Sequence, residues 1–206
     1  MKRSRTTARV TRGRRALALA LGGFALLAMA VIGGAELLRP PARPAPIADR
    51  PIAFELIDQD GRTVTPQNFS DKWLLVYFGY THCPDACPTA LNDIAEALDR
   101  LGARRAKVQP LFVTLDPERD TLDVLKPYTE TFQAGIVGLT GAPERIDALA
   151  KAYQVEYRRE PGRAAGYELD HSSLILLIDP AGRAVARFTH ETTPETLQAK
   201  LAQLVS

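Results

Sequence analysis

The sequence contains few residues that carry sulfur. Its 206 residues include two cysteines, Cys83 and Cys87, and two methionines, Met1 and Met29. Two cysteines exclude a scaffold of several disulfides and a four-cysteine zinc site, and two isolated methionines exclude a Met-rich metal-binding surface. Histidine is equally scarce, so a metal site has only three imidazoles to draw on: His82, His171 and His190.

The main domain also lacks an excess of positive charge. The formal net charge is +2, but residues 1–39 hold eight Lys/Arg and one acid, whereas residues 40–206 hold 18 basic and 23 acidic residues, a net charge of −5. A domain with this charge has no general electrostatic reason to bind nucleic acid. The length allows one ordinary domain plus a tail.

The N-terminal region predicts a membrane anchor. Residues 1–15 are strongly basic, and residues 16–35 form an uncharged, mostly apolar run whose helix would span roughly 30 Å, the thickness of a bilayer core. The basic flank keeps the N-terminus in the cytoplasm. We therefore expect a single-pass protein of the inner (cytoplasmic) membrane, with residues 36–51 as a Pro-rich tether and residues 52–206 as a soluble domain on the periplasmic or extracytoplasmic side.

Two alternatives exist for this region. The segment Ala28-Met29-Ala30 resembles a cleavage site, and Arg14-Arg15 suggests a twin-arginine signal, although its neighbours fit that motif poorly. The apolar run is longer than the ~7–15 residues of a signal core, which favours an uncleaved anchor. All three interpretations export the domain, and in a Gram-negative bacterium they place it in the oxidising periplasm.

Hydrophobic periodicity in the domain predicts alternating strands and helices. The expected order is a hairpin over 54–64, a strand over 73–80, a helix over 88–101, a strand over 107–115, a helix over 121–132 that Pro127 should kink or split, a strand over 136–139, a helix opened by Pro143, strands over 173–178 and 184–188, and a last helix capped by Thr193. With two cysteines just after the central strand, this order predicts an α/β thioredoxin-like fold, in which helices flank a central mixed sheet and the N-terminal hairpin is an insertion.

The cysteines have C-x-x-x-C spacing. Pro88 suits the first position of a helix, which puts Cys87 at the N-cap and argues against regular helix over 84–87. Such a pair can close as a disulfide, Cys83–Cys87, or open to hold one metal ion. A helix N-terminus lowers the pKa of a thiol, which favours either chemistry. A structural disulfide or two inert thiols is the alternative, but a five-residue ring contributes little stability.

A third metal ligand is best supplied by His171, because it directly precedes the strand over 173–178. In a thioredoxin layout that loop passes beside the first strand–helix turn. His82 adjoins Cys83, and neighbouring side chains usually project in different directions, whereas His190 is expected to be a solvated turn residue. Two nearby carboxylates have an equally good explanation as surface or turn residues: Asp85 and Asp170.

Two thiolates and an imidazole form a soft, three-coordinate ligand set. Thiolates select Cu(I), zinc and iron–sulfur clusters, and imidazole suits copper, whereas structural zinc requires four ligands. We therefore expect one copper ion per domain, three-coordinate as Cu(I), with a water or a nearby oxygen added for Cu(II). Metal binding requires reduced thiols, so the metal-bound and disulfide states exclude one another, and the protein needs an external thiol reductant.

Four segments together resemble the Sco/SenC family: residues 77–88 (YFGYTHCPDACP), 115–121 (LDPERDT), 138–141 (GLTG) and 170–172 (DHS). Members of this family are membrane-tethered, thioredoxin-like copper-binding proteins used in assembling cytochrome c oxidase. The resemblance covers nearly the whole soluble domain. It implies copper ligands at Cys83, Cys87 and His171. Asp116 matches an acidic position whose role the sequence does not indicate.

The resemblance implies two functions. One is a copper chaperone, which takes copper from an upstream periplasmic donor and delivers it to the binuclear copper centre of a cytochrome c oxidase subunit. The other is a thiol–disulfide oxidoreductase that reduces the cysteines of that centre. His171 favours the chaperone, because dithiol exchange does not require an imidazole, and the missing cis-proline weakens the reductase. A peroxiredoxin is a third and weaker alternative, since the cysteine spacing fits it poorly.

Overall fold

The computed structural model describes residues 51–161 and 166–205. The predicted basic N-terminus, membrane anchor and nearly all of the tether lie outside these residues. In the described part of the chain, no helix is long and apolar enough to cross a membrane.

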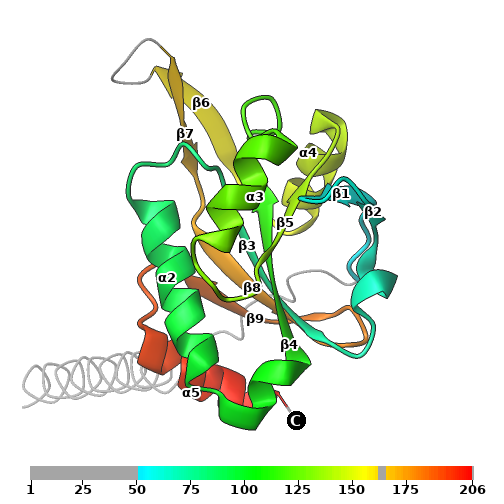
Figure 1. Ribbon diagram of the computed structural model, residues 1–206, viewed down its shortest axis with the longest axis vertical. Helices are drawn as coiled ribbons and strands as arrows, with labels where there is room; N and C mark the ends of the chain where they lie inside the picture. The colour runs from blue at the N-terminus through cyan, green and yellow to red at the C-terminus, as the bar shows by residue number, and fades with distance from the viewer. Residues whose placement is uncertain (1–50, 162–165, 206) are drawn as a thin grey trace, which may run out of the picture. The chain divides into compact units, whose positions relative to one another are not determined.

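A mixed β-sheet forms the centre of the domain (Figure 1). Among the described residues it has seven strands, in the order β2-β1-β5-β4-β3-β8-β9. These strands are β1 (Leu56–Asp58), β2 (Thr63–Val64), β3 (Trp73–Gly79), β4 (Val108–Thr114), β5 (Val137–Thr140), β8 (Leu174–Ile178) and β9 (Ala184–Thr189). The central strand β3 pairs in parallel with β4 and antiparallel with β8, which gives the mixed sheet that the sequence predicted.

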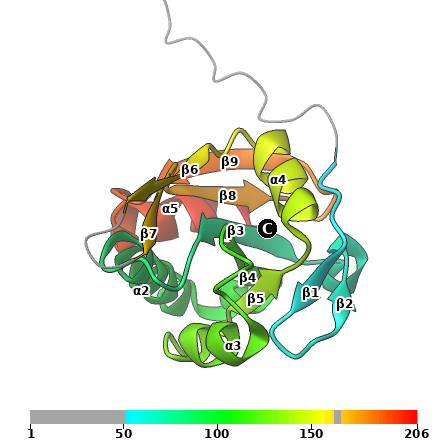
Figure 2. The same ribbon diagram turned by 90° about the horizontal axis from the view of Figure 1, so that it is seen from above.

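Helices cover both faces of this sheet. They are α2 (Ala86–Asp99), α3 (Leu122–Glu130), α4 (Pro143–Ala152) and α5 (Pro194–Leu204), with two 3-10 turns, η1 (Pro66–Phe69) and η2 (Gly102–Lys107). Figure 2 shows α2 and α3 on one side of the sheet and α4 on the other. The predicted cap of the last helix is confirmed, because the Thr193 side chain accepts a hydrogen bond from the N–H of Thr196.

The core lies between β3, β4 and the helices. Six of the seven residues of β3 are buried, and the rings of Tyr77, Phe78 and Phe112 are 0% exposed. A strand with neighbours on both edges and helices on both faces has no polar side to show, which explains its continuous apolar run. The α/β thioredoxin-like arrangement predicted for the main domain is therefore confirmed.

The N-terminal hairpin extends the sheet rather than standing apart from it. Strand β1 pairs antiparallel with β5, and the side chain of Gln59 accepts hydrogen bonds from the N–H of Gly138 and the hydroxyl of Thr129. Asp58 closes the hairpin turn by accepting from the N–H groups of Asp60 and Arg62. The predicted hairpin insertion is thus bonded to the edge of the sheet and to α3.

The start of α2 corrects one prediction. Asp85, not Cys87, is the N-cap, and Cys87 is the second residue of the helix. The N–H groups of a first helical turn have no acceptor within the helix, so Pro88 at the third position removes no hydrogen bond. The N–H of Cys87 instead donates to Sγ of Cys83 at 3.3 Å.

Helix α3 corrects a second prediction. It runs unbroken through Pro127 and ends at Glu130, before the predicted end at residue 132. The missing N–H of Pro127 frees only the carbonyl of Asp123, in the first turn, and both residues are exposed. Water can satisfy that carbonyl, so the proline does not split the helix.

A second, two-stranded sheet was not predicted. Strands β6 (Tyr157–Pro161) and β7 (Tyr167–His171) pair antiparallel, with Tyr157 opposite His171. His171 is therefore the last residue of a strand and not part of a loop. The hairpin is mostly polar, and Leu169 is its one buried side chain among the described residues. It consequently lacks the alternation of apolar and polar residues that marks a half-buried strand.

Candidate metal centre

Three elements bring the predicted ligands together. Cys83 lies in the loop after β3, Cys87 in the first turn of α2, and His171 at the end of β7. Their ligand atoms all lie within 4.8 Å of one another, and Cys87 Sγ is 3.5 Å from Nε2 of His171. In the described part of the chain this is the one group of three or more His, Cys, Asp or Glu side chains that converge closely enough to hold a metal ion.

This arrangement fits a small soft ion. Donor atoms that share one ion through bonds of about 2.0 to 2.3 Å stand about 3.5 to 4 Å apart, so the three donors need to close by only a fraction of the separation that they already have. Both thiols are free, as metal binding requires. The same proximity of the two sulfur-bearing side chains also permits disulfide formation.

The two cysteines differ in their protonation. A hydrogen bond from the Cys87 thiol, helped by His171 and by the N–H groups of Cys87 and Asp85, lowers the pKa of Cys83 to about 4. The same hydrogen bond and burial raise the pKa of Cys87 above its usual range. At neutral pH the pair therefore holds one thiolate, at the half-buried Cys83, beside one thiol.

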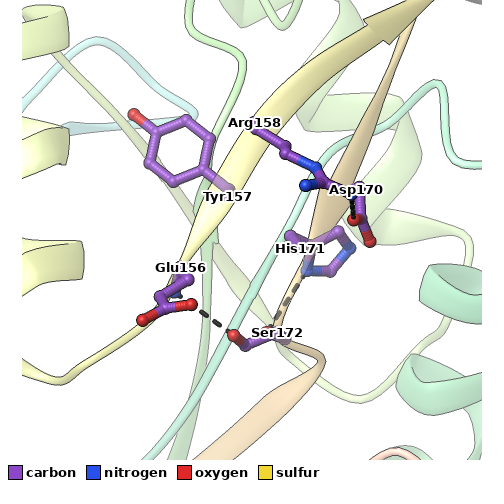
Figure 3. A pocket seen from close by; sticks show the side chains of 6 residues that line it. All are labelled: Glu156, Tyr157, Arg158, Asp170, His171 and Ser172. Carbon is purple, nitrogen blue, oxygen red and sulfur yellow. Dashed lines mark hydrogen bonds and ion pairs between the residues drawn. The ribbon is translucent and has the colours of Figure 1, made fainter.

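His171 is oriented toward the sulfur atoms by its neighbours. Its Nδ1 lies 3.3 Å from the carbonyl oxygen of Ser172, and this contact leaves Nε2 directed toward Cys87. The ring also packs edge-on against Tyr80, with 5.8 Å between the ring centroids. Figure 3 shows His171 at the wall of an open cavity of about 420 Å³, lined also by Glu156, Tyr157, Arg158, Asp170 and Ser172.

The remaining candidates lie outside the cluster. His82 is exposed, and its Nδ1 is 3.5 Å from Oδ1 of Asp120. His190 is an exposed turn residue, as predicted. Asp170 pairs with the Arg158 guanidinium at 2.9 Å (Figure 3), and Asp85 is exposed at the helix N-cap.

The sequence did not indicate which residues pack around Cys87. A Cβ placed on Gly79 would lie 2.9 Å from Sγ of Cys87, 3.0 Å from the Phe112 ring and 3.1 Å from Cε1 of Tyr77. Only glycine therefore allows the sulfur to lie this close to the end of β3. The available signal was its place on β3, where Tyr77 and Gly79 share one face and the cysteine loop follows directly.

Two buried phenols also face this region. The hydroxyls of Tyr77 and Tyr128 have no hydrogen-bond partner among the described residues. Burial, followed by the nearby Cys87, raises the pKa of both phenols above its usual range. Unpaired hydroxyls are rare in protein cores. The Tyr77 ring lies beside the Cys87 sulfur at the end of β3, and this sulfur becomes a stronger hydrogen-bond acceptor when it loses its proton.

Comparison with known proteins agrees with this geometry. The family model of SCO1/SenC matches residues 44–206. The chain belongs to the SCO1/SenC family. Protein SenC of Rhodobacter capsulatus is 42% identical over 143 residues, which is 69% of this chain and 64% of that protein. The mitochondrial SCO1 homolog 1 of Arabidopsis thaliana is 41% identical over 128 residues, 62% of this chain and 38% of that protein. The matches thus span less than two thirds of the length of these two SCO1/SenC relatives.

Two solved SCO1/SenC structures are similar over the domain. ScoI of Arabidopsis thaliana with copper bound has a TM-score of 0.71 and 35% identity, covering 74% of this chain and 96% of that one. ScoI of Bradyrhizobium japonicum with copper bound has a TM-score of 0.67 and 40% identity, covering 74% of this chain and 98% of that one.

Proposed function

We propose that this SCO1/SenC protein is a membrane-anchored copper chaperone that binds one copper ion through Cys83, Cys87 and His171. The observation that carries the proposal is the convergence of these three donors within 4.8 Å. Two thiolates and an imidazole are a ligand set that suits copper, and the similar ScoI structures hold copper. The chaperone delivers its ion to the binuclear copper centre of a cytochrome c oxidase subunit.

The proposed chaperone depends on other proteins of the compartment to which its domain is exported. An upstream periplasmic donor supplies the copper, and a thiol reductant keeps the cysteine pair open. Residues 16–35 hold the domain at the inner membrane, on its periplasmic side. Fractionation of cells that express the full chain or a chain without residues 16–35 tests this part, and recovery of the full chain in the soluble fraction would contradict it.

Copper titration of the reduced full chain tests the ligand assignment. We expect one Cu(I) per chain, and no tight binding by the double variant Cys83→Ser/Cys87→Ser. His171→Ala should keep weakened Cu(I) binding, because two thiolates still suit Cu(I), and should lose stable Cu(II) binding, which prefers nitrogen and oxygen donors. The matched control is His190→Ala, which changes an exposed histidine and should leave both affinities unchanged. Normal oxidase maturation by His171→Ala would overturn the chaperone.

The unequal cysteines support a second candidate, a thiol–disulfide oxidoreductase. The Cys83 thiolate attacks one sulfur of a target disulfide and displaces the other as a thiolate, which forms a mixed disulfide. Cys87, after losing its proton, then attacks Cys83. This step releases the second target thiolate and leaves the Cys83–Cys87 disulfide, which the external reductant returns to two thiols.

The two candidates differ in their need for His171. Exchange depends on the fraction of thiolate, on access and on the leaving group, so His171→Ala should retain reversible oxidation of the cysteine pair. If this variant also supports oxidase assembly in cells, the oxidoreductase is the physiological function. If the variant fails to support oxidase assembly while its dithiol exchange is intact, copper delivery is the physiological function.

A further inference from the structure

The loop between β4 and α3, residues 115–121, lies against both halves of the metal centre. Its first residue is tied to the end of β3 by a hydrogen bond of 2.7 Å from the N–H of Leu115 to the carbonyl of Gly79. It carries two acidic residues that are almost completely buried, Asp116 at 1% and Asp120 at 0% exposure. Burying a carboxylate costs free energy unless it is well bonded, so the partners of these residues show what the loop holds in place.

Asp120 holds the cysteine loop. Its carboxylate accepts hydrogen bonds from the N–H of Thr81 at 3.0 Å and from the hydroxyl of Thr81 at 2.6 Å. The hydroxyl of Thr114, at the end of β4, donates to the same carboxylate. Because Thr81 lies two residues before Cys83, these bonds fix the point from which the cysteine loop departs.

Asp116 and Arg119 hold the strand that carries His171. The carboxylate of Asp116 accepts from the Tyr167 hydroxyl at 2.6 Å and also pairs with the guanidinium of Arg119. Arg119 donates to the backbone carbonyl of Tyr167 at 2.9 Å, and its guanidinium carbon lies 3.7 Å from the centroid of the Tyr167 ring. Tyr167 is the first residue of β7, and His171 is the last.

Neighbouring side chains reinforce this second attachment. Arg159, on β6, lies 4.6 Å from the Tyr167 centroid and pairs with Glu118 of the loop at 2.7 Å. Arg119 also lies 5.9 Å from the ring of Tyr80, the ring that packs against His171. The β6–β7 hairpin has only one buried apolar side chain in its described residues, so polar and stacking contacts must supply much of its attachment.

We propose that the loop of residues 115–121 is a positioning element that sets the two halves of the metal centre separately. Asp120, through Thr81, places Cys83, and the Asp116–Arg119 pair, through Tyr167, places His171. None of these residues is a ligand. The inference rests on the proposed copper function, and it assigns a role to Asp116, which the sequence left without one.

Variants of the two attachments should have different signatures in the reduced full chain. Arg119→Gln loosens the histidine side, so we expect Cu(II) affinity to fall about 10- to 100-fold, the range for residues that orient metal ligands. Cu(I) affinity should change less than about threefold, and the equilibrium constant of the Cys83–Cys87 disulfide with glutathione less than about twofold, because two thiolates suffice for both. Tyr167→Phe keeps the ring and loses one hydrogen bond, so its effect on Cu(II) should be smaller.

Asp120→Asn loosens the cysteine side. We expect its disulfide equilibrium constant with glutathione to shift by about tenfold, together with a fall of about tenfold in Cu(I) affinity. If this variant does not fold, Thr81→Val replaces it, since that change removes the hydroxyl contact and keeps the backbone one. The matched control is Asp179→Asn, in the β8–β9 turn, where another buried carboxylate accepts from backbone N–H groups and pairs with an arginine. Asp179→Asn should lower the melting temperature without changing the Cu(I) affinity or the disulfide equilibrium constant.

The outcomes separate positioning from general stability. If Arg119→Gln and Asp120→Asn change all three constants together, in proportion to the loss of melting temperature, the loop is only structural and the inference is overturned. If the wild-type chain binds no copper, the proposed function fails, but the disulfide equilibrium and the NMR signals of the His171 ring remain as tests. We then still expect the His171 signals to shift in Arg119→Gln and the disulfide equilibrium to shift in Asp120→Asn. The absence of both shifts would overturn the proposed role of the loop.

Discussion

Cys87 and His171 lie 3.5 Å apart, yet they are held by different kinds of structure. Cys87 is 0% exposed and sits in the apolar core between α2 and the end of β3. His171 ends a mostly polar hairpin outside the main sheet. Hydrogen bonds and the Arg119 guanidinium stacked on the Tyr167 ring attach this hairpin to the 115–121 loop. Close packing leaves a buried side chain few alternatives, whereas a hydrogen bond replaces a bond to water and adds only about 0.5 to 1.5 kcal/mol net.

This difference predicts that the two ligands differ in how easily they move. Cys87, packed in the core, keeps its position whether or not a metal is present. A ligand on a lightly attached hairpin can move at lower cost, since elements with few buried apolar contacts open more easily than the core. Changes to the two sides should therefore separate Cu(II) binding from Cu(I) binding and thiol chemistry.

The largest effect is expected where the hairpin meets the core. Leu169→Ala removes its one buried apolar side chain in the described residues, and Leu→Ala changes in cores cost about 2 to 5 kcal/mol. Urea unfolding should show this loss, and Cu(II) titration should show weaker binding with thiol exchange unchanged. Leu201→Ala, at a 0% exposed position of α5, is the control that should lose stability alone. Equal loss of Cu(II) binding in both variants would contradict the separate attachment of the cysteine and histidine ligands.

The next effect tests the cysteine side. Gly79→Ala places a methyl group 2.9 Å from Sγ of Cys87, and overpacking of this kind costs about 1 to 3 kcal/mol. We expect a lower melting temperature and weaker Cu(I) binding, because the sulfur must move. Gly138→Ala would bring its Cβ 2.8 Å from Leu125, between β5 and α3, and should lower the melting temperature without weakening Cu(I) binding. Unchanged Cu(I) affinity in Gly79→Ala would show that the core does not fix Cys87.

The charge of the cysteine side predicts a pH dependence of stability. The pKa of Cys83 falls from its ordinary value of 9.0 to about 4 in the folded protein, so the unfolded state binds more protons between these pH values. The free energy of unfolding of the reduced protein should therefore rise from pH 5 to pH 8, and this contribution is lost as the pH falls through 4.

Comparison with Cys83→Ser isolates the contribution of Cys83, because the variant should lack the part of the rise in unfolding free energy that comes from ionisation of this thiol. The raised pKa of Cys87 acts in the opposite sense and only above its ordinary value of 9.0, outside the measured range. Partial exposure of Cys83 screens its interactions and reduces the size of the effect. Parallel pH profiles for the wild type and the variant would mean that Cys83 is not a thiolate at neutral pH.

The smallest effect concerns the unpaired phenol beside Cys87. Tyr77→Phe removes a buried hydroxyl that has no partner in the described residues, so the metal-free reduced protein should gain up to about 1 kcal/mol in stability. Tyr157→Phe is the contrasting control, since its hydroxyl donates to Asp147, and it should not gain stability. Denaturant unfolding of the two variants measures the difference, and a clear loss in Tyr77→Phe would reveal a bond that this hydroxyl makes in solution.

The sequence by itself determined the order of the helices and of the strands of the main sheet, and the location of the cysteine pair. The apolar run of β3, the proline-led helices and the turns are local patterns, and local periodicity suffices to predict them. Errors occurred where a local rule was applied too strictly. Pro88 was placed at the first helical position, although a first turn tolerates proline elsewhere. Pro127 was expected to kink or split a helix that is continuous through it.

Only the tertiary structure decided how the centre is held together. The contacts that matter join residues far apart in the chain: 39 positions separate Thr81 from Asp120, 48 separate Arg119 from Tyr167, and 84 separate Cys87 from His171. Polar contacts between distant segments leave no periodic pattern, and a short polar hairpin looks like a loop in sequence. The contacts of Asp116, Arg119 and Asp120 can be identified only in the folded protein, where their partners lie within hydrogen-bonding distance.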